Sequence, residues 1–577
     1  MTRAAMTRLL AALLLLLALP ALAARPYRGG VVSSLYPPAA EAGLQMLDRG
    51  GNAVDAAVAM AFAAGVVGPY HNGLAGGGFA VLTLQGKDTL ALDFREVAPA
   101  AARRDMFLRD GKPVPGLSTD GGLSVAVPNA VNGYLALLER AGSLPRSVVL
   151  APAIRLARDG VVVSPKYRQM ASGRLECLRR DPEASRIFLR PGPDGRPDVP
   201  ALGTRIRQPD LARTLERIAA AGAPAVRSGP IARAIVQTVQ GAGGIVSEKD
   251  LARIRARWRT PLWGSYRGYR IATFPPPSGG GVILLETLGM LERLRPDGFQ
   301  RRAPADLHLY IEALRRAYAD RSRFVSDPDQ AEVPTARLLS SEHIAELAAS
   351  IDPARATPSS AIQPAGAIGG AGTAAPSEPK HTTEISVLDR AGNAVALTTT
   401  VNYGFGSCLV ARGTGLLLND QMDDFSTQPG VPNVYGLVYG DANAVAPGKI
   451  PVSSMAPTLV FQKDRPERVL LVVGASGGAF IPTGILQLVT NVLDARMNLP
   501  VAVAAGRVHH QWLPDVVMVT LDGVEPATRA ALEAMGHTFK VSESPLADVE
   551  AVMEDPDTGL RSAASDPRGE GAGLGQP

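Results

Sequence analysis

The feature that most constrains the fold is an abrupt change in the character of the sequence near residue 381. From Asp352 to Lys380, Pro, Ala, Gly, Ser and Thr dominate and no hydrophobic period survives, which predicts a flexible linker or an exposed segment. Thr382–Leu388 and Ala394–Val401 then have the pattern of two strands, joined by an Ala-Gly-Asn turn. The sequence therefore predicts a buried hairpin that begins directly after a linker.

Helical patterns dominate before the linker. Apolar residues recur at helical spacing from Ala39 to Val67, and Asn52 between two predicted helices suits a helix N-cap. Another helix is predicted from Pro304 to about Arg323. Phe274–Gly281 is predicted to be a loop, because it contains three prolines and three glycines.

After the hairpin, strands and helices alternate. A strand is predicted at Val469–Val473, a helix from about Ala479 to Leu493, and a strand–helix–strand tail over Pro514–Pro545. A chain of 577 residues can form one large domain or two or three ordinary ones, and 46% hydrophobic residues are enough for a proper core. Disorder is therefore not expected for most of the chain.

The N-terminus has the layout of a secretory signal peptide over residues 1–23. Arg3 and Arg8 precede an apolar run at Leu9–Leu19, and the small residues of Ala21-Leu22-Ala23 follow. The run is too short for a bilayer-spanning helix. Its removal takes two arginines and no acidic residue from a net charge of +5, and the remaining basic residues are scattered. We expect an exported protein, periplasmic or secreted, that binds neither nucleic acid nor membrane after signal removal.

Cysteine and histidine usage gives no sign of a metal centre. The two cysteines, Cys177 and Cys408, cannot form a thiolate zinc site alone, and no HExxH motif is present. An oxidising compartment permits a bridge between them, but one pair is not a disulfide framework, so two unpaired cysteines are expected. No metal or cofactor is expected.

Two residues compete as the nucleophile. Ser476 lies in Gly-Ala-Ser-Gly-Gly between a predicted strand and a predicted helix, the context of a nucleophile elbow. Asp494 and either His509 or His510 follow in the order of an α/β-hydrolase triad. The alternative for this motif is a glycine turn whose backbone N–H groups point into a site.

Thr382 is the other candidate. A threonine hydroxyl needs an adjacent base, and an α-amine released by chain cleavage before Thr382 would supply one, because α-amines titrate at about 7.7–8.0. A Thr-Thr pair at a strand start is also ordinary β-branched strand chemistry. The spacing alone does not decide between Ser476 and Thr382.

Several long motifs resemble those of the γ-glutamyltranspeptidase family, in the family's order from Arg25 to about Arg568. The motifs are Gly50–Ala59 (GGNAVDAAVA), Leu92–Pro99 (LDFREVAP), Tyr318–Ser322 (YADRS), TTEISV from Thr382, Leu417–Phe425 (LLNDQMDDF), GVPNVYGL, GDANAV, Pro451–Thr458 (PVSSMAPT) and His509–Asp515 (HHQWLPD).

The resemblance implies an α+β fold, a four-layer αββα sandwich of the N-terminal-nucleophile hydrolase type. It implies a precursor that cuts its own His381–Thr382 bond into a large subunit, residues 24–381, and a small catalytic subunit, residues 382–577, of the same domain. The linker at 352–380 would end at the cut.

The resemblance also assigns catalytic roles. Thr382 would be the nucleophile and Thr400 would orient it through a hydrogen bond, which neighbouring antiparallel strands allow. Gly477 and Gly478 would stabilise the tetrahedral oxyanion with their N–H groups. This role for the glycines removes the main support for Ser476.

Substrate contacts follow in the same way. Arg95 would grip the α-carboxylate of a γ-glutamyl group, with Ser453 and Ser454 as adjacent donors. Asn402, Gln421 and Asp424 would accept hydrogen bonds from its α-ammonium group. Tyr435 would be the aromatic gate of a lid loop at Pro429–Gly436.

Two positions depart from the family pattern. Glu384 replaces a common histidine and is expected to face the same side as Thr382, adding negative charge near the site. Ala479-Phe480 replaces Ser-Arg, removing a polar contact and adding bulk. Both departures bear on acceptor preference and substrate range.

The resemblance implies an exported γ-glutamyl acyltransferase or hydrolase that acts on glutathione and related amides through a γ-glutamyl-threonine ester, with water, an amino acid or a dipeptide as acceptor. The alternatives are a same-fold acylase of the β-lactam side-chain type, a serine hydrolase using Ser476, and a binding protein without turnover. Such acylases tend to lack the lid and the aspartate at Asp424, which favours the γ-glutamyl function.

Overall fold

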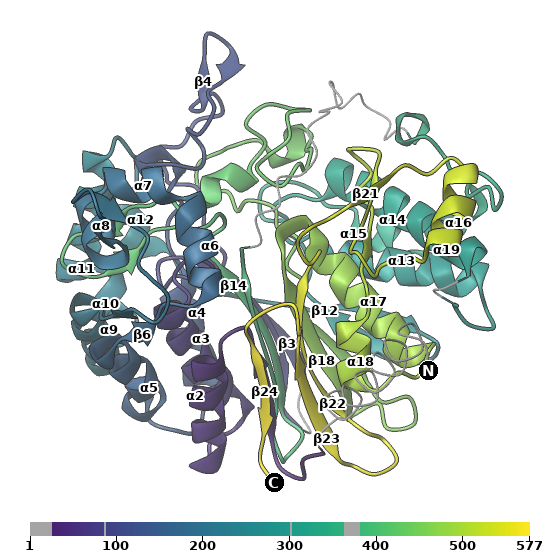
Figure 1. The fold of residues 1–577 in the computed structure, drawn as a ribbon, viewed down its shortest axis with the longest axis horizontal. Coiled ribbons are helices and arrows are strands. Elements are labelled where there is room, and N and C mark those ends of the chain that lie inside the picture. The colour runs from purple at the N-terminus through teal and green to yellow at the C-terminus, as the bar shows by residue number, and fades with distance from the viewer. Residues whose placement is uncertain (1–25, 86–87, 301–302, 363–380) are drawn as a thin grey trace, which may run out of the picture.

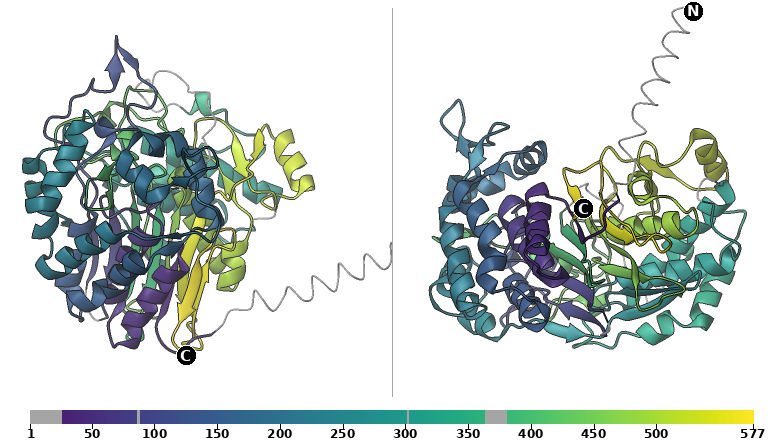
Figure 2. Two further views of the ribbon diagram at one scale, coloured as in Figure 1. Left: turned by 60° about the vertical axis from the view of Figure 1, so that its left-hand side comes forward. Right: turned by 90° about the horizontal axis from the view of Figure 1, so that it is seen from below.

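The computed structural model describes residues 26–85, 88–300, 303–362 and 381–577, so the predicted signal peptide and most of the predicted linker lie outside the described residues. Two antiparallel sheets are stacked face to face, with helices on both outer faces (Figure 1, Figure 2). This arrangement confirms the predicted four-layer αββα sandwich.

Within the described ranges, one sheet has seven strands and the other has six. In spatial order the first contains β10 (Arg257–Arg259), β3 (Thr89–Asp93), β2 (Gly77–Thr83), β14 (Ala394–Thr400), β13 (Thr383–Leu388), β1 (Val31–Ser34) and β24 (Ala572–Gly575). The second contains β11 (Leu262–Tyr266), β12 (Tyr269–Thr273), β17 (Thr458–Phe461), β18 (Val469–Ser476), β22 (Asp548–Glu554) and β23 (Arg561–Ser565).

The central strands β2, β13 and β14 are buried on both faces because each face packs against another layer. In β2, Phe79 and Val81 lie in the core between the sheets, whereas Ala80 and Leu82 lie in the core beneath the first helical layer. The ring of Phe79 stacks on that of Phe274 at a centroid distance of 4.1 Å. Successive side chains of a strand point to opposite faces, so β2 contributes side chains to both cores.

Helices α2 (Pro37–Asp48) and α3 (Ala53–Val67) cover the first sheet. Asn52 caps α3 with its side chain, and Asp55 completes the capping box, which confirms the predicted helix start. The second sheet is covered by α13 (Gly280–Leu294), α14 (Pro304–Phe324), α17 (Ile481–Leu493) and α18 (Leu499–Ala504). The tail has β20 (Val517–Val519), α19 (Pro526–Ala534) and β21 (Phe539–Val541), as predicted.

Both sheets combine strands from before and after residue 382. β1 pairs with β13 and β24, and β2 pairs with β14. In the second sheet β12 pairs with β17. A break at residue 381 would thus leave two pieces that share both sheets and both cores.

Two loop predictions are partly wrong. Gly280 and Gly281 belong to α13 rather than to the preceding loop, because the first turn of α13 packs so closely on Ser454 that a Cβ at Gly280 would lie 2.3 Å from its carbonyl oxygen. The start of the predicted linker is packed: Ser359 is buried, and its backbone N–H donates to the Asp515 carboxylate at 2.7 Å. Composition did not reveal this contact with the C-terminal tail.

The expectation of unpaired cysteines is wrong. Cys177 on α7 (Leu175–Arg180) and Cys408 form a disulfide, with their Cα atoms 5.8 Å apart. The two cysteines are 231 positions apart in the sequence, so only the tertiary packing of α7 on the segment before β15 (Val410–Ala411) brings them together.

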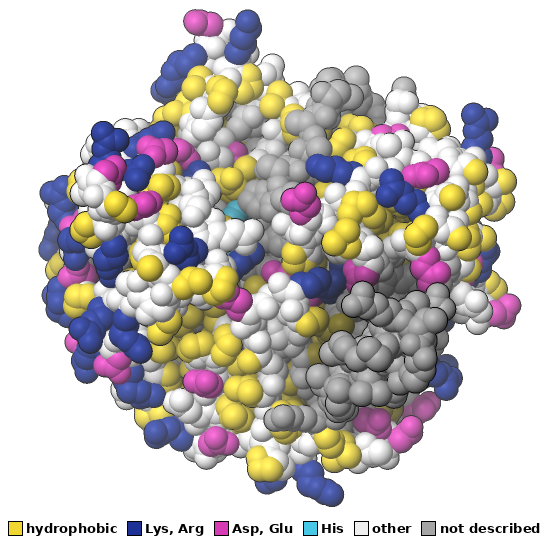
Figure 3. All heavy atoms as spheres, viewed as in Figure 1, with side chains coloured by type: hydrophobic (Ala, Val, Ile, Leu, Met, Phe, Trp, Pro, Cys, Tyr) yellow, Lys and Arg dark blue, Asp and Glu magenta, His cyan; other side chains and the backbone are white. Residues whose placement is uncertain are grey.

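Charge on the surface is mixed. On the face in Figure 3, Lys and Arg side chains are scattered among Asp and Glu side chains over the helical layer at the left, and no uninterrupted basic stripe crosses this face. Within the described ranges we find no helix with the length and apolarity that a bilayer crossing requires.

Candidate active site

A small cavity lies where β13 begins and β14 ends. All the predicted site residues except His381 and Gly477 line it, and these two are direct neighbours of lining residues in the chain. The lining residues are Arg95, Thr382, Thr400, Asn402, Gln421, Asp424, Tyr435, Leu437, Tyr439, Ser453, Ser454, Met455, Gly478 and Ile481. Segments remote in sequence thus converge on Thr382.

Thr382 and Thr400 face each other across the hairpin. The register pairs Thr383 with Thr399, so the next residues outward lie side by side, and their Oγ1 atoms are 3.4 Å apart. Thr400 Oγ1 also accepts a hydrogen bond from the Asn402 N–H at 2.9 Å. This bond fixes the Thr400 hydroxyl, which can then orient Thr382.

The backbone at Thr382 is strained. Its φ is +145°, a region that β-branched residues avoid because Cβ collides with the backbone. The preceding residue, His381, is fully buried against the ring of Tyr403 at 4.8 Å, and burial holds the pKa of its imidazole well below the ordinary value. His381 is thus a neutral group next to a strained peptide.

The Ser476 alternative does not assemble. Ser476 ends β18, is fully buried, and its Oγ has no hydrogen-bond partner within the described residues. The other members of the supposed triad bond elsewhere: Asp494 to Tyr266 and Arg267, His509 to Thr483 and Gln511, and His510 to Asp515 and Trp512. Ser476 therefore lacks an activating base.

Arg95 follows β3 and carries its guanidinium into the cavity. Its Nη2 forms an ion pair with Asp424 Oδ2 at 2.5 Å and also donates to the Val452 carbonyl at 3.3 Å. The same Asp424 oxygen accepts from Gln421 Nε2 at 2.6 Å, and its other oxygen accepts from Asn433 Nδ2 at 3.2 Å. Opposite charges are therefore held together in one buried site.

Burial also changes the protonation of the neighbouring carboxyl groups. It raises the pKa of Asp424, although the Arg95 charge opposes this effect. Burial raises the pKa of Glu96, which lies 3.8 Å from Arg95, to about 8, and that of Asp423 to about 6. Glu96 is mainly neutral at pH 7, so Asp424 is the main partner of Arg95.

Ser453 and Ser454 also line the cavity. Ser454 Oγ accepts a hydrogen bond from Arg321 Nη2 at 3.2 Å, and the same nitrogen donates to Tyr439 Oη at 2.7 Å. The Arg321 guanidinium also lies over the Tyr439 ring, 4.6 Å from its centroid. Ser454 is thus held beside a second buried positive charge.

The lid residue Tyr435 closes one side of the cavity. Its hydroxyl donates to the Asn402 carbonyl at 2.7 Å, and its ring lies against the backbone of Gly478. A Cβ at Gly478 would come within 2.6 Å of the Tyr435 ring, and both Gly477 and Gly478 have positive φ, at +127° and +57°. Only glycine fits this turn after β18.

The two departures from the family pattern lie outside the cavity lining. Glu384 is enclosed between the sheets, where Thr398 Oγ1 donates to its carboxyl group at 2.5 Å. Burial raises the pKa of Glu384 to about 8, so the expected extra negative charge is wrong at neutral pH. Phe480 packs edge-to-face on His509 at 4.6 Å and is not among the residues that line the cavity.

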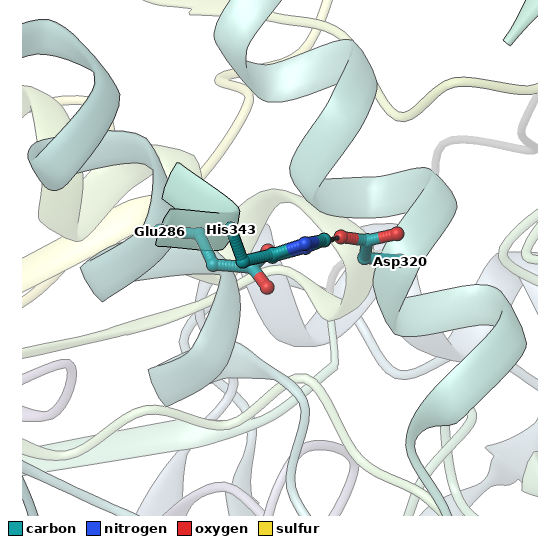
Figure 4. A group of neighbouring side chains, drawn as sticks. All are labelled: Glu286, Asp320 and His343. Atoms are coloured by element: carbon teal, nitrogen blue, oxygen red, sulfur yellow. Dashed lines mark hydrogen bonds and ion pairs between the residues drawn. The ribbon is translucent and has the colours of Figure 1, made fainter. Parts of the chain in front are cut away.

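Elsewhere, one group of described residues has the donor types of a metal site. Glu286 on α13, Asp320 on α14 and His343 on α16 (Ser341–Ala349) place ligand atoms within 4.8 Å of one another (Figure 4). Asp320 Oδ2 is already bonded to His343 Nε2 at 2.6 Å. Burial raises the pKa of Glu286 well above its ordinary value, so a neutral acid beside an Asp–His pair accounts for this group.

Sequence reasoning gave no role to the apolar lining residues Leu437, Met455 and Ile481 or to three polar residues of the site. Arg321 supports Ser454, Tyr439 lines the cavity, and Asn433 binds Asp424. Arg321 stands in the YADRS motif, whose arginine on an otherwise buried helix could have signalled a buried charge with a partner.

Comparison with known proteins gives matches along almost the whole chain. A sequence profile described as "Gamma-glutamyltranspeptidase" matches residues 39–576. The "Glutathione hydrolase proenzyme" of Escherichia coli (strain K12) is 41% identical over 541 residues, which cover 93% of this chain and 90% of that protein.

Two proteins named as acylases are also similar to this chain. The "Acylase ACY 1 proenzyme" of Pseudomonas sp. (strain SE83) is 35% identical over 547 residues, covering 93% of this chain and 91% of that protein. The crystal structure of cephalosporin acylase from Bacillus halodurans superposes with a TM-score of 0.81 at 26% identity, covering 96% of this chain and 97% of that one. Over almost its whole length, this chain is therefore similar both to a protein named as a glutathione hydrolase and to proteins named as acylases.

Proposed function

The chain belongs to the gamma-glutamyltranspeptidase family, and we propose that it is an exported γ-glutamyl hydrolase and acyltransferase, activated by cleavage of its own His381–Thr382 bond. The family match confirms the prediction of an enzyme of the γ-glutamyltransferase and glutathione hydrolase type with an N-terminal-nucleophile fold. The observation that carries the proposal is the cavity in which Thr382 and the Arg95–Asp424 pair meet.

Cleavage converts Thr382 into an N-terminal residue with its own base. The α-amine, with a pKa of about 7.7–8.0 in the absence of perturbation, accepts the proton of the Thr382 hydroxyl as that oxygen attacks. Thr400 holds the hydroxyl in place from the adjacent strand, at 3.4 Å. The positive φ of Thr382 supports the cut at this bond, because breaking the peptide releases the strain.

The γ-glutamyl group is bound as a zwitterion. Its α-carboxylate lies against Arg95 with donation from Ser453 and Ser454, and its α-ammonium group lies against Asp424, Gln421 and Asn402. These residues surround one cavity, and their charges match those of the substrate.

Acyl transfer then proceeds in two steps. Thr382 Oγ1 attacks the γ-carbonyl carbon, the carbonyl oxygen becomes an oxyanion that accepts hydrogen bonds from the Gly477 and Gly478 N–H groups, and the amine leaves with a proton. The resulting γ-glutamyl ester of Thr382 is attacked by water or by the amine of an amino acid or dipeptide. That attack restores the Thr382 hydroxyl.

The substrate class is glutathione and related γ-glutamyl amides. The relative from Escherichia coli carries the name of a glutathione hydrolase proenzyme, and this chain covers 90% of it. Export is supported by the signal-like N-terminus and by the disulfide, since disulfides persist in oxidising compartments.

An acylase for another amide is the second candidate, favoured by the similarity to cephalosporin acylase and Acylase ACY 1. It would use the same nucleophile without needing a zwitterion clamp. The buried Arg95–Asp424 pair favours the γ-glutamyl function. Burying two charges costs desolvation free energy, and an apolar acyl group would form no charged contact with either side chain to offset that cost.

The test combines processing with turnover. Wild-type protein should give two fragments, the smaller beginning at Thr382 by N-terminal sequencing, and should hydrolyse a γ-glutamyl anilide; Thr382→Ala should remain one inactive chain. Cleavage of Thr382→Ala at the same bond would refute the assignment of Thr382. A processed wild type that cleaves a β-lactam side-chain amide but not the anilide would favour the acylase.

A further inference from the structure

The segment from Asn402 to Cys408 connects the active-site cavity to the disulfide. Its backbone has positive φ at Asn402 (+76°), Phe405 (+58°) and Cys408 (+61°), a conformation that non-glycine residues seldom adopt. The segment therefore depends on contacts with its surroundings to keep this shape.

Those contacts come from residues on the other side of the proposed cut. Arg174 Nε donates to the Gly404 carbonyl at 2.9 Å, and Arg174 Nη2 donates to the Gly406 carbonyl at 3.0 Å. The same nitrogen forms an ion pair with Asp120 at 2.8 Å. Cys177, three positions after Arg174, makes the disulfide with Cys408.

The disulfide lies next to the contacts that Arg174 makes with this segment, and both of its cysteines are buried. Cys177 and Cys408 are only 7% and 2% exposed, and their Cα separation of 5.8 Å is ordinary for a disulfide. Beside them, Val410 N–H donates to Oδ2 of Asp181, the residue that follows α7, at 3.0 Å, so the end of α7 and the strand after Cys408 are also joined by a hydrogen bond.

We infer that the Cys177–Cys408 disulfide is a covalent bond between the two subunits of the mature enzyme. Cys177 precedes the His381–Thr382 bond and Cys408 follows it, so cleavage leaves one cysteine in each product. The inference rests on the proposed cleavage, because in an uncleaved chain the same disulfide lies within one polypeptide.

The Cys177–Cys408 disulfide keeps the two subunits covalently joined after cleavage. Two subunits held only by packing separate when they unfold, whereas linked subunits return to each other at a high effective concentration. The link also joins the large subunit to the segment that carries Asn402 into the cavity. Cleavage therefore frees the Thr382 amine while the two halves remain one covalent molecule.

Electrophoresis tests the link directly. Purified wild-type protein is treated with N-ethylmaleimide to block free thiols, denatured in SDS and run with and without dithiothreitol. We expect one band at full mass without reductant and two fragments with it. Cys177→Ser and Cys408→Ser should each give two fragments without reductant, and Thr382→Ala is the matched control for an uncut chain.

The outcomes separate the two proposals. Two fragments in both lanes would overturn the disulfide link while leaving the cleavage intact. One band in both lanes would mean that the chain is not cut, and both proposals would fall. Should either serine variant fold poorly, a non-reduced digest of the wild type replaces it: peptides linked through Cys177 and Cys408 support the inference, and their presence only as free, alkylated peptides contradicts it.

Discussion

Arg95 Nη2 lies 2.5 Å from Asp424 Oδ2, so the two opposite charges of the cavity are each other's partners. Both side chains are buried, and each charge depends on the other for compensation. A γ-glutamyl substrate brings one carboxylate and one ammonium group, and can therefore replace each partner while the cavity stays neutral.

The first prediction concerns Arg95. Arg95→Lys should raise KM for a γ-glutamyl anilide by about 100-fold with a smaller change in kcat, because lysine keeps the charge but loses the planar fork that holds a carboxylate. Steady-state kinetics measures the split. Arg104→Lys, in an exposed pair with Asp441, is the matched control and should change neither constant. An unchanged KM in Arg95→Lys would show that the α-carboxylate binds elsewhere.

The second prediction concerns the hydroxyl that faces Thr382. Thr400→Val, which keeps the shape and removes the hydroxyl, should slow both self-cleavage and turnover by roughly 10- to 100-fold, since a lost hydrogen bond at the reacting group costs about 1–3 kcal/mol. Thr400→Ser should restore most of both rates. Equal rates in the valine variant and the wild type would remove Thr400 from the mechanism.

The third prediction concerns the lid. Tyr435→Phe keeps the ring against Gly478 but loses the hydrogen bond from Oη to the Asn402 carbonyl, 2.7 Å away. KM should rise several-fold while kcat changes little, because the cavity wall loosens but the nucleophile is untouched. Tyr403→Phe, whose side chain does not line the cavity, is the control. A large fall in kcat with KM unchanged would contradict a role in substrate enclosure.

The fourth prediction concerns pH. Burial raises the folded-state pKa of Glu384 from 4.5 to about 8, so the folded protein holds this proton more tightly than the unfolded chain does. The contribution of Glu384 to stability is therefore full below about pH 4.5 and is lost as pH rises towards 8. Glu384→Gln should remove this pH-dependent loss of stability. The difference in free energy of unfolding, variant minus wild type, should therefore increase from pH 5 to pH 8.

Urea unfolding at several pH values measures that difference. Glu467→Gln, at an exposed position, should follow the wild-type pH dependence and serves as the control. A constant offset between Glu384→Gln and wild type across the window would mean that Glu384 is charged in the folded protein.

The sequence predicted most of the elements because local patterns agree with the fold. Asn52 caps a helix, Pro304 begins one, and the hairpin around Thr382 has the strand boundaries expected to within a residue. The predicted site residues also come together around one cavity, but their motifs identified them through family resemblance rather than through spacing. Their individual roles stay predictions until the variants are measured.

The remaining features of the fold and of the site depend on tertiary contacts, which no local sequence pattern predicts. The disulfide joins residues 231 positions apart, and Ser359 in an unpatterned segment is buried by the C-terminal tail. Arg321 lies in the YADRS motif, but the motif assigns no role to it, because only the packing of α14 shows that its guanidinium reaches Ser454. Alternation placed Glu384 on the same face as Thr382, but the structure encloses its carboxyl group between the sheets, outside the cavity lining. Its charge depends on how completely the sheets exclude water.

The position of β1 has a consequence for the order in which the protein can fold. β1 lies between β13 and β24, so the first strand of the sandwich to be synthesised acquires both neighbours only when the last residues of the chain are available. A chain that is still attached to the ribosome cannot complete this sheet, and such long-range pairing makes folding slow. The chain must therefore remain soluble while it is incomplete. Loss of β24 would leave one edge of β1 unpaired and exposed.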